Sequence, residues 1–112
     1  MTSQAEIHDL VYSKDANQRR KAAKFLKEKF GHQEDKGQAW EDLIRLVQDV
    51  DNTVRWYIAD AMGSAYSLVP DKAQAWMDLH RLTQDEDGFV RSSTAGAIGS
   101  AFSLVPDKAQ AW

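Results

Sequence analysis

The sequence predicts an all-α chain built as a contiguous stack of helical hairpins, and three observations lead to that prediction. Tryptophans recur every 36 residues, at Trp40, Trp76 and Trp112. The segment 51–76 is identical to 87–112 at 18 of 26 positions. Apolar residues recur at three- and four-residue spacing, which is typical of helices that bury one face. Because each unit leads directly into the next without a linker, the units are expected to pack against one another.

The 36-residue register divides the chain into an N-terminal capping helix over 1–14 and units over 15–50, 51–86 and 87–112, the last one truncated. The first helix of a hairpin is expected to begin at Pro70 or Pro106, because proline is tolerated where the amide hydrogen has no partner. Its apolar stripe is predicted to comprise Ala39, Trp40, Leu43, Leu46 and Val47, and one unit later Ala75, Trp76, Leu79, Leu82 and Thr83.

A short acidic turn then precedes the second helix of each hairpin, at 49–53 and at 85–89. Aspartate side chains in such turns can cap the helix that follows. The second helix is predicted to bury Val54, Ile58, Ala61, Met62 and Ala65.

The second helices also carry a family resemblance. Asp51, Val54, Arg55, Ala59, Ala61, Met62 and Gly63 form a pattern that recurs from Asp87 to Gly99 and, in part, in the first unit. This pattern resembles the second helix of a HEAT repeat, and is most similar to the short HEAT-like repeats of phycobilisome-lyase-type proteins. The resemblance implies a right-handed α–α superhelix, a HEAT-like solenoid, whose second helices line the concave face.

The same charged residues recur in successive units, as Asp51 with Arg55 and Asp87 with Arg91. One interpretation is an acid–base or anion-binding array. The interpretation that the resemblance supports is a structural ladder, in which each aspartate caps its own helix and each arginine bridges to the aspartate of a neighbouring unit. A charge pair with the period of the scaffold favours the structural role.

Packing is likewise the expected role of the recurring tryptophans and glycines. We expect Trp40 and Trp76 to be largely buried between layers. Glycine costs about 1 kcal/mol against alanine inside a helix. We therefore interpret Gly63 and Gly99 as positions where two helices approach closely.

Residues that differ between units lie on the outward positions of the second helices, which is the face that HEAT-like proteins use for binding. The segment 19–29 holds six basic residues and one acidic residue. The candidate partner-binding residues on this face are Arg20, Lys24, Lys27, Trp56, Asp60 and Ser92.

Composition excludes several classes of site. The chain has no cysteine, which excludes disulfides, thiolate zinc sites and cysteine nucleophiles. Its formal charge of −3 weighs against general binding to DNA or anionic membranes. The histidines show no metal-ligand spacing and no catalytic motif is present, so we expect no catalytic residue, metal or cofactor. No apolar stretch has the length of a membrane span, and we expect a soluble, cytoplasmic protein.

The leading functional hypothesis is a non-enzymatic scaffold that binds a protein partner on the concave face. The alternative is nucleic-acid binding through the basic helix 19–29, with Trp56 stacking on a base. A lyase-type or base-excision enzyme on a HEAT-like scaffold is a distant third. The last unit keeps the apolar composition of an interior repeat in Phe102, Leu104, Val105 and Trp112. This predicts either a fragment of a longer array or an end that a second copy covers, and in both cases self-association through the last unit.

Overall fold

Helices supply all the regular secondary structure in residues 3–68 and 71–101, the part of the chain that the computed structural model describes. The prediction of an all-α chain is confirmed for these residues. Short 3-10 helices follow α2 and α4, at Phe30–His32 and Tyr66–Leu68. The α-helices are α1 (Gln4–Val11), α2 (Ala16–Lys29), α3 (Lys36–Leu46), α4 (Asn52–Ala65), α5 (Lys72–Leu82) and α6 (Gly88–Ala101).

Aspartates fix where five of these helices begin, because each carboxylate accepts a hydrogen bond from an amide of the first turn. At α5 the cap is Asp71, so the helix begins at Lys72. The sequence had predicted a start at Pro70. Pro70 and Pro106 lie outside the described residues. The capping aspartates of α2 to α6 are Asp15, Asp35, Asp51, Asp71 and Asp87.

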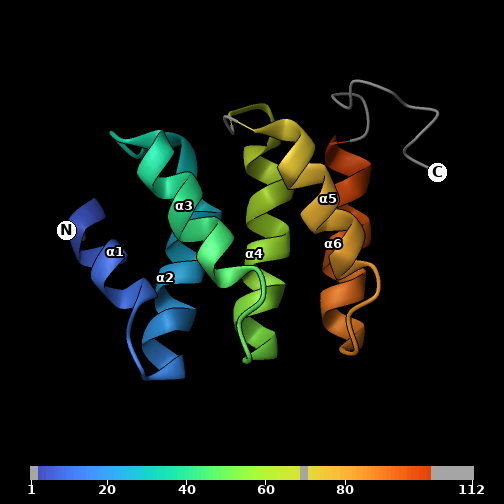
Figure 1. The fold of residues 1–112 in the computed structure, drawn as a ribbon, viewed down its shortest axis with the longest axis horizontal. Helices are drawn as coiled ribbons and strands as arrows, with labels where there is room; N and C mark the ends of the chain where they lie inside the picture. Colours follow the sequence, from blue (N-terminus) through green and yellow to red (C-terminus); the bar gives the residue numbers. More distant parts are fainter. Residues whose placement is uncertain (1–2, 69–70, 102–112) are drawn as a thin grey trace.

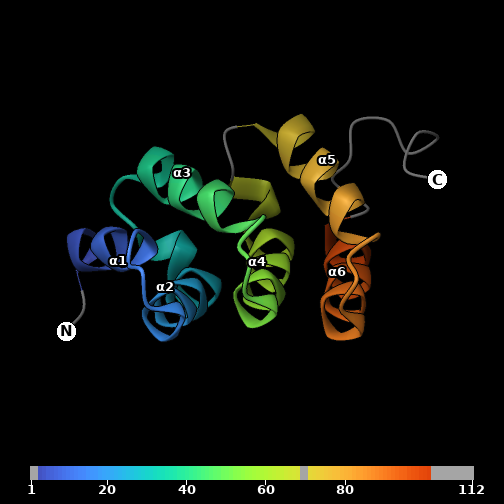
Figure 2. The same cartoon turned by 60° about the horizontal axis from the view of Figure 1, so that its bottom comes forward.

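The helices form two layers. The helices α2, α4 and α6 lie side by side, with α4 packed between the other two (Figure 1). The turned view shows α3 and α5 in a second layer over them, with α1 beside α2 at one end (Figure 2). The hairpins α3–α4 and α5–α6 therefore contribute one helix to each layer, and α3 and α5 leave the other face of the α2–α4–α6 layer uncovered.

The core lies between the two layers and consists mainly of the predicted apolar residues. The five positions predicted on α4 are at most 1% exposed, and the five predicted on α3 and at its C-terminal end are all buried. On α5, however, Trp76 and Thr83 are only partly buried. Trp40 is covered because α3 packs against α1, α2 and α4, whereas α5 packs mainly against α4 and α6. Trp76 packs against the core but is less deeply buried than Trp40, and Trp112 lies outside the described residues.

The two recurring helix glycines differ in their surroundings. A Cβ atom added to Gly63 would lie 2.7 Å from the Cα atom of Ala97, so α4 and α6 touch through their backbones there. Close approach is thus confirmed at Gly63. At Gly99 an added Cβ would meet nothing within 4 Å in the described structure, and the same interpretation is wrong there. The reason is positional, because among the described helices α6 has a neighbour in its layer only on the α4 side.

Candidate functional site

The recurring arginines connect successive hairpins (α1–α2, α3–α4 and α5–α6), but through a different aspartate from the one predicted. Nε and Nη2 of Arg55 donate to the two carboxylate oxygens of Asp85, at 2.8 and 3.1 Å. Arg19 makes the same two-pronged contact with Asp49, at 2.8 and 3.3 Å. The sequence predicted that Arg55 would bridge to the cap of the next helix, Asp87. The observed partner stands two residues earlier, at the start of the turn that precedes α6.

This contact is electrostatically strong. The hydrogen bond to Asp85 raises the pKa of the Arg55 guanidinium. Burial opposes ionisation of Asp85, but the hydrogen bonds from Arg55 and from the Asp87 amide outweigh it and lower the pKa of the carboxyl. Both groups are charged at neutral pH, and their side chains are only about a tenth exposed, at 11% and 9%. These groups act as a clamp between successive hairpins and not as an acid–base pair.

The capping half of the predicted ladder is present in the structure. Asp51 accepts from the Val54 amide at 3.0 Å, and Asp87 accepts from the Val90 amide at the same distance. Hydrogen bonds from Arg20 lower the pKa of Asp51. Both carboxylates therefore cap helices and have a structural role.

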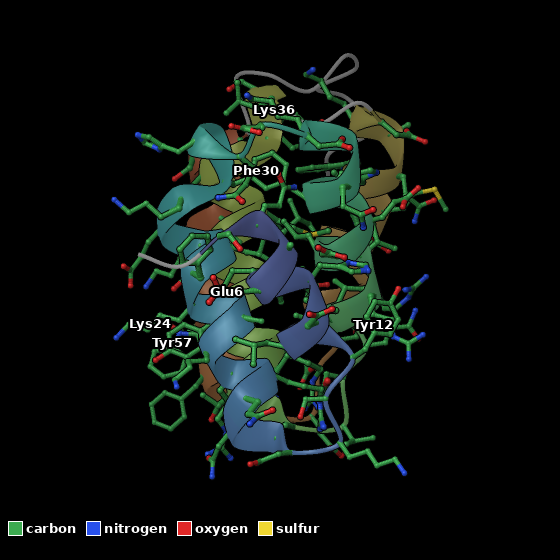
Figure 3. The ribbon with its side chains drawn as sticks, turned by 90° about the vertical axis from the view of Figure 1, so that its left-hand side faces the viewer. Glu6, Tyr12, Lys24, Phe30, Lys36 and Tyr57 are labelled. Atoms are coloured by element: carbon green, nitrogen blue, oxygen red, sulfur yellow. The ribbon has the colours of Figure 1, made fainter. Side chains whose placement is uncertain are left out.

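Carboxylates of the next unit neutralise much of the predicted basic surface. Arg20 donates to Asp51 at 2.6 and 3.1 Å, and Lys27 lies 3.4 Å from Asp60. Arg19 is held by Asp49, as described above. Of the predicted binding residues on α2, Lys24 stays exposed without an ion pair in the described structure. It lies on the side of α2 opposite α3, together with Tyr57 (Figure 3).

Three aromatic side chains gather on α4 and at the start of α6, and we call them the aromatic surface: Trp56, Tyr57 and Phe89. The rings of Trp56 and Tyr57 stack at 5.5 Å between centroids, and Phe89 lies 6.1 Å from Trp56. Trp56 is 37% exposed and Phe89 is 72% exposed. Lys27 lies over the Tyr57 ring at 5.6 Å. Single exposed apolar residues are common on protein surfaces. A contiguous patch of exposed aromatic side chains, in contrast, is typical of a binding surface.

The other predicted residues lie around this surface. Ser92 on α6 is exposed, and Asp60 on α4 is partly buried against Lys27. Sequence analysis missed Tyr57 and Phe89. The sequence did contain a signal for Phe89, because this aromatic residue replaces the polar Asn17 and Thr53 at the equivalent positions of the first two units.

Two buried acids were also missed. Asp42 on α3 and Asp78 on α5 occupy equivalent positions, and each has one carboxylate oxygen without a hydrogen-bond partner. The other oxygen of Asp42 lies 2.7 Å from Nδ1 of His8. Asp78 has no such histidine in the described structure; Gln74 donates to it at 3.1 Å and Arg81 at 3.3 Å. Burial raises the pKa of Asp78.

Replacing Asp78 by asparagine is therefore expected to stabilise the chain at pH 7, by about 1 kcal/mol. Because its pKa is raised on folding, Asp78 favours the folded state below the unfolded pKa of about 3.8, and this contribution is lost as the pH rises through the folded value. The gain from Asp78→Asn should thus disappear near pH 3.5, where the wild-type carboxyl is itself protonated. Urea unfolding at the two pH values measures it. The matched variant Asp42→Asn should destabilise instead, because it weakens the contact with His8.

A cleft of about 700 Å³ lies between the start of α1 and the end of α2, with Phe25, Lys29 and Gln33 among its lining residues. Its one deeply buried polar side chain is Gln33, whose Nε2 donates to the carbonyl of Lys29 at 2.8 Å. That donor is used within the chain, and the cleft shows no convergent set of charged groups.

Neither a metal-binding cluster nor a membrane span occurs in the described ranges. No three His, Asp or Glu side chains there are placed to hold a metal ion. None of the helices in these ranges combines the length and apolar character that crossing a membrane requires. No protein-family model, curated protein or solved structure matches the chain.

Proposed function

We propose that this chain is a non-enzymatic protein-interaction module, in which the uncovered face of the α2–α4–α6 layer binds a protein partner. The proposal includes the right-handed HEAT-like superhelix that the repeat pattern suggests, with α2, α4 and α6 on its concave side. The two-layer arrangement of hairpins supports this architecture (Figure 2).

The observation that carries the proposal is the aromatic surface. Trp56 occupies the position that Arg20 holds one unit earlier, where Arg20 clamps the next cap, Asp51. In the second pair of units Asn52 contacts the cap Asp87 instead, at 2.7 Å, and Trp56 is left beside the exposed ring of Phe89. Tryptophan and tyrosine supply large contact areas at low entropic cost and are enriched in interface hot spots.

Neutralised arginines make nucleic-acid binding the weaker candidate. Arg19, Arg20 and Lys27 each face a carboxylate, so the basic helix offers phosphate oxygens fewer free cations than its composition suggests. A phosphate-binding surface would need these groups unpaired.

Affinity capture tests the proposal. The wild-type chain, a Trp56→Ala/Phe89→Ala variant and a Met77→Ala control are immobilised and exposed to nuclease-treated lysate of the native source. Met77 is 61% exposed on α5, in the other layer, so its loss removes apolar surface elsewhere. We expect a protein that wild type and Met77→Ala retain and that the double aromatic variant loses.

The purified binder is then titrated at 50 and 200 mM salt. A contact centred on Trp56 should lose little affinity over this range, whereas contacts to several phosphates would lose about a thousandfold or more. Equal capture by the aromatic variant would exclude this surface as the binding site. Binding that is seen in untreated lysate and lost after nuclease treatment would replace the proposal with the nucleic-acid alternative.

A further inference from the structure

The α6 face that lies away from α4 repeats the α4 face on which α6 itself packs. Ala59 on α4 is fully buried, whereas its equivalent Ala95, 36 residues later, is exposed. Gly63 lies against Ala97, whereas Gly99 meets nothing within 4 Å in the described structure. In its layer α6 is the last described helix (Figure 1). It therefore presents an uncovered copy of an interface that the chain has already built once.

Arg91 shows which chemical group this face is missing. In the preceding hairpins one arginine nitrogen, Nη1, donates to a turn carbonyl of its own hairpin, at 3.0 Å for Arg19 and 2.7 Å for Arg55. The other two donors, Nε and Nη2, clamp the carboxylate in the turn of the next hairpin. Nη1 of Arg91 makes the same anchoring bond, at 2.8 Å to the carbonyl of Asp85. No carboxylate faces its Nε and Nη2 in the described structure. The guanidinium is thus held ready for a two-pronged carboxylate contact.

The carboxylate that such a guanidinium accepts belongs to a defined turn. In both observed cases it is the first residue of an Asp-x-Asp turn, whose second aspartate caps the following helix. Asp49 and Asp85 also accept the amide of the second aspartate, at 2.9 Å each. The turn itself therefore holds the carboxylate of its first aspartate in place, before an arginine of a neighbouring hairpin contacts it.

A second copy of this chain does not supply that turn. Asp49 and Asp85 are already clamped by Arg19 and Arg55 of their own chain. At the equivalent place in the first hairpin, α1–α2, stands Ser13, whose hydroxyl accepts the Asp15 amide at 3.1 Å but carries no charge. This first hairpin keeps the shape of the turn and lacks its carboxylate.

We infer that the open face of α6, formed by Arg91, Ala95 and Gly99, is a docking site for a helical hairpin with an Asp-x-Asp turn. The first aspartate of the docked hairpin contacts Nε and Nη2 of Arg91. A small residue of its second helix lies against Gly99, as Ala97 lies against Gly63. This site is separate from the aromatic surface, and its partner is defined by a carboxylate turn and a small helix residue.

A peptide with the sequence of residues 72–101 serves as the probe, because it carries Asp85, Asp87 and Ala97 in the required order. The probe bears Gly99→Ala so that it cannot itself act as a docking site. Its binding to the full chain is measured by titration calorimetry. Arg91→Gln in the chain and Asp85→Asn in the probe should each weaken binding about tenfold, and together no further, as expected for two partners of one contact.

Two glycine variants of the chain form the matched pair. Gly99→Ala should abolish docking, because its Cβ would meet the backbone of the docked helix as it would at Gly63. Gly96→Ala lies one turn earlier and also meets nothing within 4 Å, and its equivalent Asp60 already carries a side chain in the α4 packing. It should bind the probe as wild type does. Both substitutions favour helix, so a difference between them reports docking.

In a second experiment the same probe is joined to the C-terminus of the chain by a flexible linker. The tether raises the effective concentration of the probe to the millimolar range, so the probe can fold as it docks and need not fold alone first. The tethered chain should melt at a higher temperature than the untethered chain, and Gly99→Ala should remove that rise. Equal rises in the Gly99→Ala and Gly96→Ala chains would overturn the inference, as would no rise at all. Dimerisation of the wild-type chain that Gly99→Ala abolishes and Arg91→Gln leaves unchanged would assign the face to a second copy instead.

Discussion

Replacing Trp40 by alanine is expected to cost about 3–5 kcal/mol of the free energy of unfolding, because its indole is 92% buried where α3 meets three other helices. The side chain leaves a cavity that packed helices close only in part. Urea unfolding followed by circular dichroism at 222 nm, the usual helix signal, measures the loss. In a chain of this size the change should lower the melting temperature by well over ten degrees.

Trp56→Ala is the control, since a side chain on the aromatic surface contributes little to folding. Its effect on the free energy of unfolding should stay within about 0.5 kcal/mol. Trp76→Ala should fall between the two, as its partial exposure indicates. Equal costs for Trp40 and Trp56 would show that α4 is rotated relative to the arrangement described above.

Gly63→Ala and Gly99→Ala are expected to change stability in opposite directions, although they are the same substitution at equivalent positions. At Gly63 the added methyl group would lie 2.7 Å from backbone of α6, which has to move, and we expect a loss of about 1–3 kcal/mol. At Gly99 the methyl group meets open space, and the higher helix propensity of alanine should give a gain of about 0.5–1 kcal/mol. Paired urea titrations measure the difference, and a gain in both variants would contradict the contact between Gly63 and Ala97.

The repeat made the helices, their order and most of the core predictable, because periodic apolar positions directly specify the buried face of a helix. The identity of the clamped carboxylate was not predictable in the same way. Asp85 and Asp87 have the same charge and lie two residues apart, and only the geometry of the turn decides which one caps and which one receives Arg55. The shallower burial of Trp76 was not predictable for a related reason: its sequence environment resembles that of Trp40, but it has different neighbours in space.

The contacts of the aromatic surface were still less predictable from the sequence. Trp56 could be identified because it replaces a basic residue of the repeat, yet its contact with Phe89 joins residues 33 positions apart on different helices. Helical periodicity relates residues within one helix and carries no information about such contacts. The neutralised basic helix has the same origin, since Asp51 and Asp60 belong to the following unit.

Ser13 makes the addition of repeats by gene duplication easier on one side of the first hairpin than on the other. Each hairpin with an Asp-x-Asp turn and an arginine on its second helix can be copied and joined after its original without altering any residue on either side of the new junction. A hairpin added ahead of α1–α2 is different, because the turn there would offer a hydroxyl to the arriving arginine. Gene duplication can therefore add hairpins after such a hairpin in single steps, whereas addition ahead of α1–α2 requires a point mutation as well. The 18 identities in 26 positions between 51–76 and 87–112, against 14 in 36 between 15–50 and 51–86, fit a more recent duplication of the last two units.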